Sequence, residues 1–158
     1  MWGAIFEWWG SIYANHAALR TATEFLHIGG LMFAGGCALT ADLASITAAR
    51  ENAAGQTTQL HLLKSTHVVV VLGLVALGVS GLFLLAADVD TYWYSRIFWL
   101  KMALIVLLLL NGTLIVRYEH QVQQGTPAAW RRLHAAATAS LVLWCLTTIA
   151  GVALLNIG

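Results

Sequence analysis

The sequence predicts an all-α integral membrane protein, a four-helix up-down-up-down bundle preceded by an amphipathic helix at the membrane surface. The first observation behind this prediction is that only 9% of the 158 residues are Asp, Glu, Lys or Arg, against about 25% in soluble domains. The second is that hydrophobic residues make up 59% of the chain. A domain of this length cannot bury so much apolar surface, so the surplus must face lipid.

Long apolar runs predict four membrane spans, at about residues 22–48, 63–87, 96–118 and 131–157. Each has the ~20 residues that cross ~30 Å of hydrocarbon at about 1.5 Å per residue. Ahead of them, about residues 5–20 mix tryptophans with polar side chains, which is typical of a helix lying in the interface. Short connections make consecutive spans antiparallel, so residues 1–158 form a single domain. In it the first and fourth spans are neighbours, and the second and fourth are diagonal.

The charged residues indicate the orientation and exclude one class of partner. The net charge is +1 and no basic stripe is present, which argues against nucleic acid. Most basic residues near the spans lie at one face: they are Arg50, Lys64, Arg117, Arg131 and Arg132. By the positive-inside rule this face is cytoplasmic, so both termini are expected in the periplasm, with the protein in a bacterial inner (cytoplasmic) membrane. The first ten residues lack Lys and Arg, so no cleaved signal peptide is expected.

Three blocks of the sequence resemble the signature blocks of an uncharacterised bacterial family of four-helix membrane proteins. The blocks are FLHIGGLMFAGGCALTADL, GLFLLAADVDTYWYSRIFWLKMALIVLLLLNG and SLVLWCLTTIAG. That family is distantly similar to copper-resistance D-type membrane domains and, in architecture, to b-type cytochrome membrane subunits. The polar marks carried by the resemblance are His27, Asp42, Lys101, Asn111 and Trp144. The resemblance implies the fold but assigns these residues no role, because the family is of unknown function.

Two histidines suggest a haem site. Ionisable side chains cost about 2.5 to 3.5 kcal/mol at the centre of a span, so those present need a reason. His67 and His134 lie at a similar depth on the second and fourth spans, an arrangement suited to a haem b with two imidazole ligands. The supporting residues are Lys64, Arg131 and Arg132 near the propionates, Gly78 and Gly81 where the ring edge approaches a helix, and Asp42 behind a ligating imidazole.

Each of these assignments has an alternative. His67 and His134 can anchor helix ends at the interface instead of binding a metal. Asp42 can pair with Arg50 or Lys64 as a helix-end carboxylate. If the depth of the spans differs by one turn, His61 and His120 become the reserve ligands.

A second polar group is expected toward the opposite face. Helical periodicity places His27 on the small-residue side of the first span, so its ring should point into the bundle. Lys101 on the third span lies at a similar depth, with Glu24 nearby, and the three can hold a quinone head group or a carboxylate. His27 and Met102 are a further ligand pair for a second haem. The alternative for Lys101 is that it snorkels to the interface, and Asn111 is expected to bond a neighbouring helix.

The favoured function is a membrane-embedded b-type haem protein. It carries electrons between a quinone or a partner redox subunit and its acceptor, and is not a stand-alone catalyst. The first alternative is a copper-handling transporter or tolerance protein that uses His27, Cys37, Met102 and Cys145, whose thiols lie near the midplane. Both cysteines can equally be small apolar fillers. The second alternative is a haem-free structural or assembly subunit, and a homo-oligomer is compatible with all three.

Overall fold

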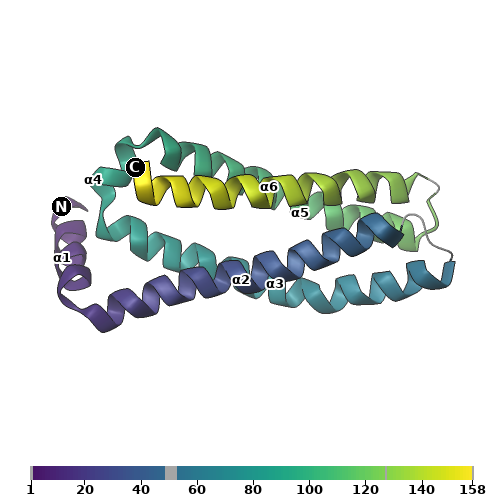
Figure 1. Ribbon diagram of the computed structural model, residues 1–158, viewed down its shortest axis with the longest axis horizontal. Coiled ribbons are helices and arrows are strands. Elements are labelled where there is room, and N and C mark those ends of the chain that lie inside the picture. The colour runs from purple at the N-terminus through teal and green to yellow at the C-terminus, as the bar shows by residue number, and fades with distance from the viewer. Residues whose placement is uncertain (1, 49–52, 127, 158) are drawn as a thin grey trace.

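The computed structural model describes the backbone of residues 2–48, 53–126 and 128–157 and the side chains of residues 3–47, 66–126 and 128–156. These ranges contain six helices and no strand. They are α1 (Trp2–Asn15), α2 (Ala17–Ala48), α3 (Ala53–Ala87), α4 (Val89–Tyr94), α5 (Arg96–Gln123) and α6 (Ala129–Ile157). The four long helices run side by side and alternate in direction (Figure 1). The prediction of an all-α up-down-up-down bundle is therefore confirmed.

The bundle has two ends, which we name the α1 end and the far end. The α1 end holds α1, α4 and the last residues of α6, and the far end holds the C-termini of α2 and α5 and the N-termini of α3 and α6 (Figure 1). The first and last helices of the chain thus reach the same side of the bundle.

Four helices are long and apolar enough to cross a membrane within the described ranges. Their spans are Ala17–Thr47, Thr66–Ala87, Arg96–Gln123 and Ala129–Asn156. Bulky apolar side chains cover their outer surface: Phe25 is 76% exposed and Leu155 is 80% exposed. Contiguous exposure of this kind is unfavourable in water and favourable in lipid. The chain is a multi-pass membrane protein in contact with the bilayer.

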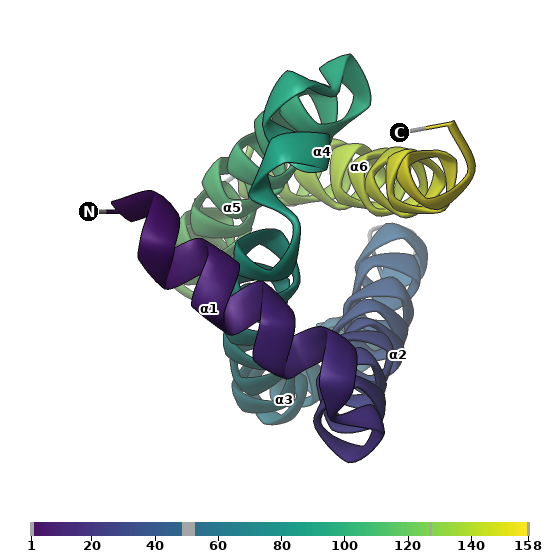
Figure 2. The same ribbon diagram turned by 90° about the vertical axis from the view of Figure 1, so that its left-hand side faces the viewer.

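Helix α1 lies across the α1 end and does not continue straight into the first span (Figure 2). It docks on the end of α3, where Trp9 Nε1 donates to the Phe83 carbonyl oxygen at 3.1 Å. A Cβ at Gly10 would lie 3.0 Å from the Ala87 carbonyl oxygen, so the two backbones approach closely. The outward face of α1 exposes Ile5, Phe6 and Trp8, as expected of a helix in the membrane interface.

The chain changes direction at His16, earlier than the boundary near residue 20 that the sequence suggests. Two side chains hydrogen-bond to carbonyl groups in the last turn of α1. Asn15 Nδ2 donates to the Ser11 carbonyl oxygen at 2.9 Å, and His16 Nδ1 donates to that of Ile12 at 2.9 Å. Side-chain donors at these positions satisfy a helix end and favour its termination.

The short connection between the second and third spans folds as the helix α4. Asp88 caps it, since its side chain accepts from the Thr91 backbone N–H at 3.3 Å. Ser95 ends α4 and caps α5, accepting from the Phe98 N–H at 3.4 Å. Trp99 Nε1 then donates to the Trp93 carbonyl oxygen at 3.0 Å. These caps hold the aromatic belt at the α1 end.

Helices α2 and α3 approach so closely that only small residues fit between them. A Cβ at Gly73 would lie 2.7 Å from the Ala34 Cβ, and a Cβ at Gly30 would lie 3.0 Å from the Gly73 carbonyl oxygen. Small residues at such a crossing let the backbones pack tightly in a membrane. This contact joins the first hairpin of the bundle, formed by α2 and α3.

The second hairpin, formed by α5 and α6, packs on the first through α2 and α6. An apolar core lies in the middle of the bundle, made by Ala34, Ala38, Leu108 and Trp144, with Leu31, Val70, Leu74, Leu77 and Leu143 around it. The predicted contact between the first and fourth spans is therefore present. In the described ranges α3 and α5 make few close backbone approaches to each other.

Gly73→Ala tests the close crossing of α2 and α3. The new Cβ must push α2 and α3 apart, and overpacking of this kind costs about 1 to 3 kcal/mol. We expect the midpoint of thermal unfolding in detergent to fall by several degrees. Gly78→Ala is the matched control, because a Cβ at this position of the same helix meets no atom within 4 Å. An equal fall in both variants would contradict the role of the crossing.

Candidate functional site

All four long helices contribute to one polar junction inside the bundle, toward the α1 end. We define the polar junction as His27 on α2, Ser80 and Gly81 on α3, Lys101 on α5, and Gly151 on α6. His27 Nδ1 lies 3.0 Å from Ser80 Oγ, and a Cβ at Gly81 would lie 3.5 Å from His27 Cε1. Lys101 Nζ lies 3.5 Å from the place of a Cβ at Gly151, within electrostatic range of His27.

Ser80 is the side-chain partner of His27, and its contacts bear on which nitrogen of His27 carries the proton. Ser80 is completely buried, and its hydroxyl lies within hydrogen-bond distance of two carbonyl oxygens, those of Ala76 at 2.6 Å and Leu77 at 3.2 Å. When the single hydroxyl hydrogen goes to either carbonyl, Ser80 Oγ accepts from His27 and Nδ1 is the donor. In that tautomer of the neutral ring, the lone pair on Nε2 is available to accept a proton or to bind a metal.

The polar junction has hydrogen-bonding capacity that the described protein atoms do not use. Lys101 is half-buried within a span, and in the described ranges its Nζ has neither a carboxylate partner nor a hydrogen-bond acceptor. Thr147, one turn from Gly151 on α6, has a buried Oγ1 without a partner among the same residues. An unpaired ammonium and an unbonded hydroxyl are both costly in hydrocarbon, so the site suits a polar ligand.

Glu24 belongs to a different contact. Its carboxylate is exposed, and Tyr13 Oη donates to Glu24 Oε1 at 3.4 Å, joining α1 to α2. Burial, with a further contribution from Glu24, raises the pKa of Tyr13, so the phenol keeps its proton. Ser80, which the sequence analysis did not single out, is the residue beside His27. The sequence feature that could have identified it is a serine next to Gly81 in an otherwise apolar span.

A second polar group lies farther along α2, about 22 Å from His27 at about 1.5 Å per residue. Asp42 is 4% exposed and lies beside Ser140 of α6, itself 4% exposed. Asp42 Oδ2 is buried without a partner among the described residues. The apolar core separates Asp42 from the polar junction.

The two histidines expected to bind haem lie toward the far end. His67 is exposed and His134 is half-buried, and neither ring has a hydrogen-bond partner among the described residues. The stripe of α3 that carries His67 continues through Leu74, which packs on the apolar core, to Gly81. At about 1.5 Å per residue, His67 is about 21 Å from Gly81 and His134 about 26 Å from Gly151. Counted from these two glycines of the polar junction, the levels of His67 and His134 differ by about 5 Å.

The structure places the described residues that were expected to support the haem in several separate positions. Arg131 and Arg132 are exposed at the start of α6. A Cβ at Gly78 would meet open space, whereas a Cβ at Gly81 would lie against His27. The side chains of Lys64, Arg50 and His61 lie outside the described residues. His120 is exposed near the end of α5.

The residues expected to bind copper lie on three helices: His27 and Cys37 on α2, Met102 on α5, and Cys145 on α6. Cys37 is half-buried and Cys145 is exposed, and both are free thiols. Met102 is half-buried. Across the part of the chain whose side chains are described, no three His, Cys, Asp or Glu residues lie close enough together to hold a metal ion.

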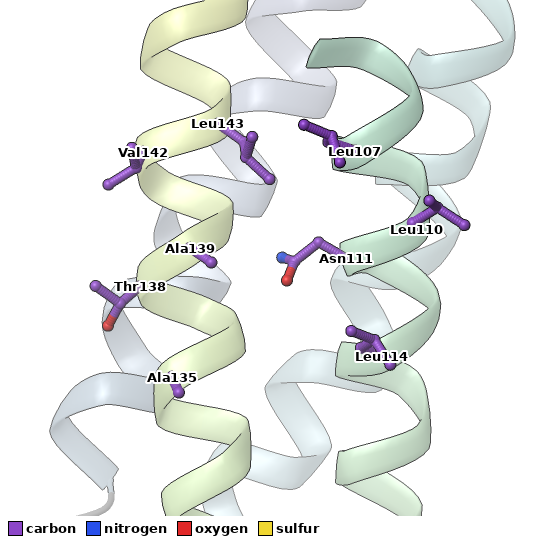
Figure 3. Close-up of a pocket in the computed structure, with 9 residues that line it drawn as sticks. All are labelled: Leu107, Leu110, Asn111, Leu114, Ala135, Thr138, Ala139, Val142 and Leu143. Atoms are coloured by element: carbon purple, nitrogen blue, oxygen red, sulfur yellow. The ribbon is translucent and has the colours of Figure 1, made fainter. Parts of the chain in front are cut away.

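A groove of about 620 Å³ lies between α5 and α6 (Figure 3). It is lined by Leu107, Leu110, Asn111, Leu114, Ala135, Thr138, Ala139, Val142 and Leu143. Asn111 reaches from α5 toward α6 (Figure 3) and donates to the Ala136 carbonyl oxygen at 2.9 Å, the expected interhelical bond. No lining residue is titratable, so we place the candidate chemistry at the polar junction and not in this groove.

Comparison of the chain with family models, with curated proteins and with solved structures finds no match.

Asn111→Leu tests the bond between α5 and α6. Interhelical hydrogen bonds within membranes average about 0.6 kcal/mol and reach about 1.7 kcal/mol, so we expect a small loss of stability in a denaturing-detergent titration. Thr113→Val is the control, because Thr113 is exposed and bonds its own helix at Leu110. An equal or larger loss of stability in Thr113→Val would contradict a contribution of the Asn111 bond to the stability of the bundle.

Proposed function

We propose that this protein is a membrane redox protein that binds a quinone head group at the polar junction and carries electrons through a haem b held by His67 and His134. The polar junction carries the proposal. It combines an ammonium group with an imidazole that has a free nitrogen, and in the described ranges neither has a carboxylate partner. Inside hydrocarbon such a pair suits an apolar molecule with carbonyl or hydroxyl oxygens.

Each residue of the polar junction has a distinct role toward such a ligand. Lys101 donates a charge-assisted hydrogen bond to a ring oxygen. His27 Nε2 accepts a hydrogen bond from a quinol hydroxyl. Ser80 is a positioning residue, since it hydrogen-bonds to Nδ1. Thr147 Oγ1 supplies a further donor.

The haem part of the proposal rests on the two imidazoles toward the far end. Both lack hydrogen-bond partners within the described residues, and they belong to α3 and α6, which do not pack on each other along their length. His67 and His134 would hold a haem b between these diagonal helices. When bound, such a haem would supply electron transfer. Arg131 and Arg132 are the propionate partners.

The proposal includes a location and a family. Arg117, Arg131 and Arg132 are exposed toward the far end, which favours a cytoplasmic far end and a periplasmic α1 end in a bacterial inner membrane. Membership of the uncharacterised four-helix family belongs to the same proposal, as does a redox partner subunit that accepts the electrons. The copper-handling and haem-free structural roles are the alternatives that the following experiments separate.

Lys101→Met tests the quinone site. Removing a charged hydrogen-bond donor costs about 1.5 to 3 kcal/mol, so we expect the affinity for a short-chain ubiquinone analogue to fall about ten- to a hundredfold. Quenching of tryptophan fluorescence in detergent measures the binding. His27→Ala should weaken binding in the same way.

Arg96→Gln is the matched control, since it removes an exposed cation from the same helix as Lys101. If Arg96→Gln and Lys101→Met lowered the affinity for the analogue equally, the loss would follow from the change in net charge and not from a contact with Lys101. Competition by benzoate at similar concentrations would identify the ligand as a carboxylate.

The visible spectrum of the purified protein, before and after dithionite, tests the haem. We expect a Soret band and a sharp α band of low-spin haem b in the reduced protein. His67→Ala or His134→Ala should abolish the low-spin spectrum, because each removes an axial ligand. His120→Ala is the control and should leave the spectrum unchanged. A colourless preparation would reject the haem, and elemental analysis would then test copper.

A further inference from the structure

Asp42 is the buried ionisable group that the proposed redox function does not use. Its side chain is 4% exposed, and Oδ2 has no hydrogen-bond partner among the described residues. The other described acidic residues are exposed or half-buried; they are Glu7, Glu24, Asp88, Asp90 and Glu119. Asp42 therefore differs from them as a carboxyl group sealed within the bundle.

The described polar neighbours of Asp42 offer little to an ionised carboxylate. Ser140 of α6 is the described side chain that faces it. Ser45, one turn farther along α2, is 1% exposed, but its hydroxyl donates to the Ala41 carbonyl oxygen at 2.9 Å. The described residues thus offer the carboxylate fewer donors than the two or three that are usual for a stabilised anion.

No described cation pairs with Asp42. On α6 the nearest titratable groups along the chain are His134 and the exposed Arg131 and Arg132, and none of them contacts Asp42. On α3 the exposed His67 does not bond it, and the side chains of His61 and Lys64 lie outside the described residues. The titratable groups of α1 lie at the opposite end of the bundle.

We infer that Asp42 is a proton-binding site, which takes up and releases a proton through the far end of the bundle. A carboxylate that is sealed from water, with no cation beside it among the described residues, is strongly disfavoured, and a bound proton removes its charge. Helix α2 continues for only about 9 Å beyond Asp42. On the other side the apolar core around Ala34, Ala38, Leu108 and Trp144 separates Asp42 from the polar junction. This inference depends on neither the quinone nor the haem.

Labelling with dicyclohexylcarbodiimide tests the site, because this apolar reagent reacts with carboxyl groups that carry a proton in apolar surroundings. The intact protein in detergent is labelled over a range of pH, and the adduct is located by peptide mass spectrometry. We expect about tenfold or more adduct at Asp42 than at the exposed Asp88 and Asp90, decreasing as the pH rises. Ser140→Ala should extend the labelling to higher pH, since it removes the donor that stabilises the ionised form.

Three results would overturn the inference. The first is that the folded protein gives no adduct at Asp42 at any pH, although the same residue is labelled when the protein is unfolded in detergent. The second is labelling that does not change with pH. The third is protection of Asp42 by sodium chloride but not by choline chloride, because the site would then hold a metal cation in place of a proton. The Asp42→Asn variant checks the assignment of the adduct. It should lose the adduct at position 42 and keep the adducts at the other carboxyl groups.

Discussion

The low polarity of hydrocarbon constrains where polar side chains can lie within the spans of this protein. Any polar group within a span must find its partner on another helix or on its own backbone, because lipid offers none. His27 bonds Ser80 of α3, and Asn111 of α5 bonds the backbone of α6. These bonds join two different pairs of helices, and Asp42 of α2 lies beside Ser140 of α6. The same groups that lower the cost of burial thus fix which faces of the bundle meet.

Helix α2 is the element on which this arrangement depends. It packs against α1, α3 and α6, and it carries His27 toward one end and Asp42 toward the other. Its contact with α3 is tight because glycine and alanine face each other there. Tight packing leaves little freedom for the His27 ring, so a small-residue crossing that serves stability also positions a chemical group.

The fold could be predicted from the sequence because span length and charge depletion depend on composition alone. The inward position of His27 followed from periodicity, and the bond of Asn111 from the cost of an amide in lipid. The partners could not be predicted: Ser80 and Ser140 look like ordinary small residues until two helices are placed side by side. Gly81 was assigned to His67 by spacing on its own helix, whereas its neighbour, His27, comes from α2. Short capped elements such as α4 were missed because one turn of helix has no periodicity.

The closest packing of the bundle runs along one seam. The hairpins α2–α3 and α5–α6 are each joined along their length, and they meet along α2 and α6. Helices α3 and α5 make few close backbone approaches in the described ranges. A substitution in the seam between α2 and α6 is therefore felt by both hairpins, whereas one between α3 and α5 disturbs fewer close backbone contacts.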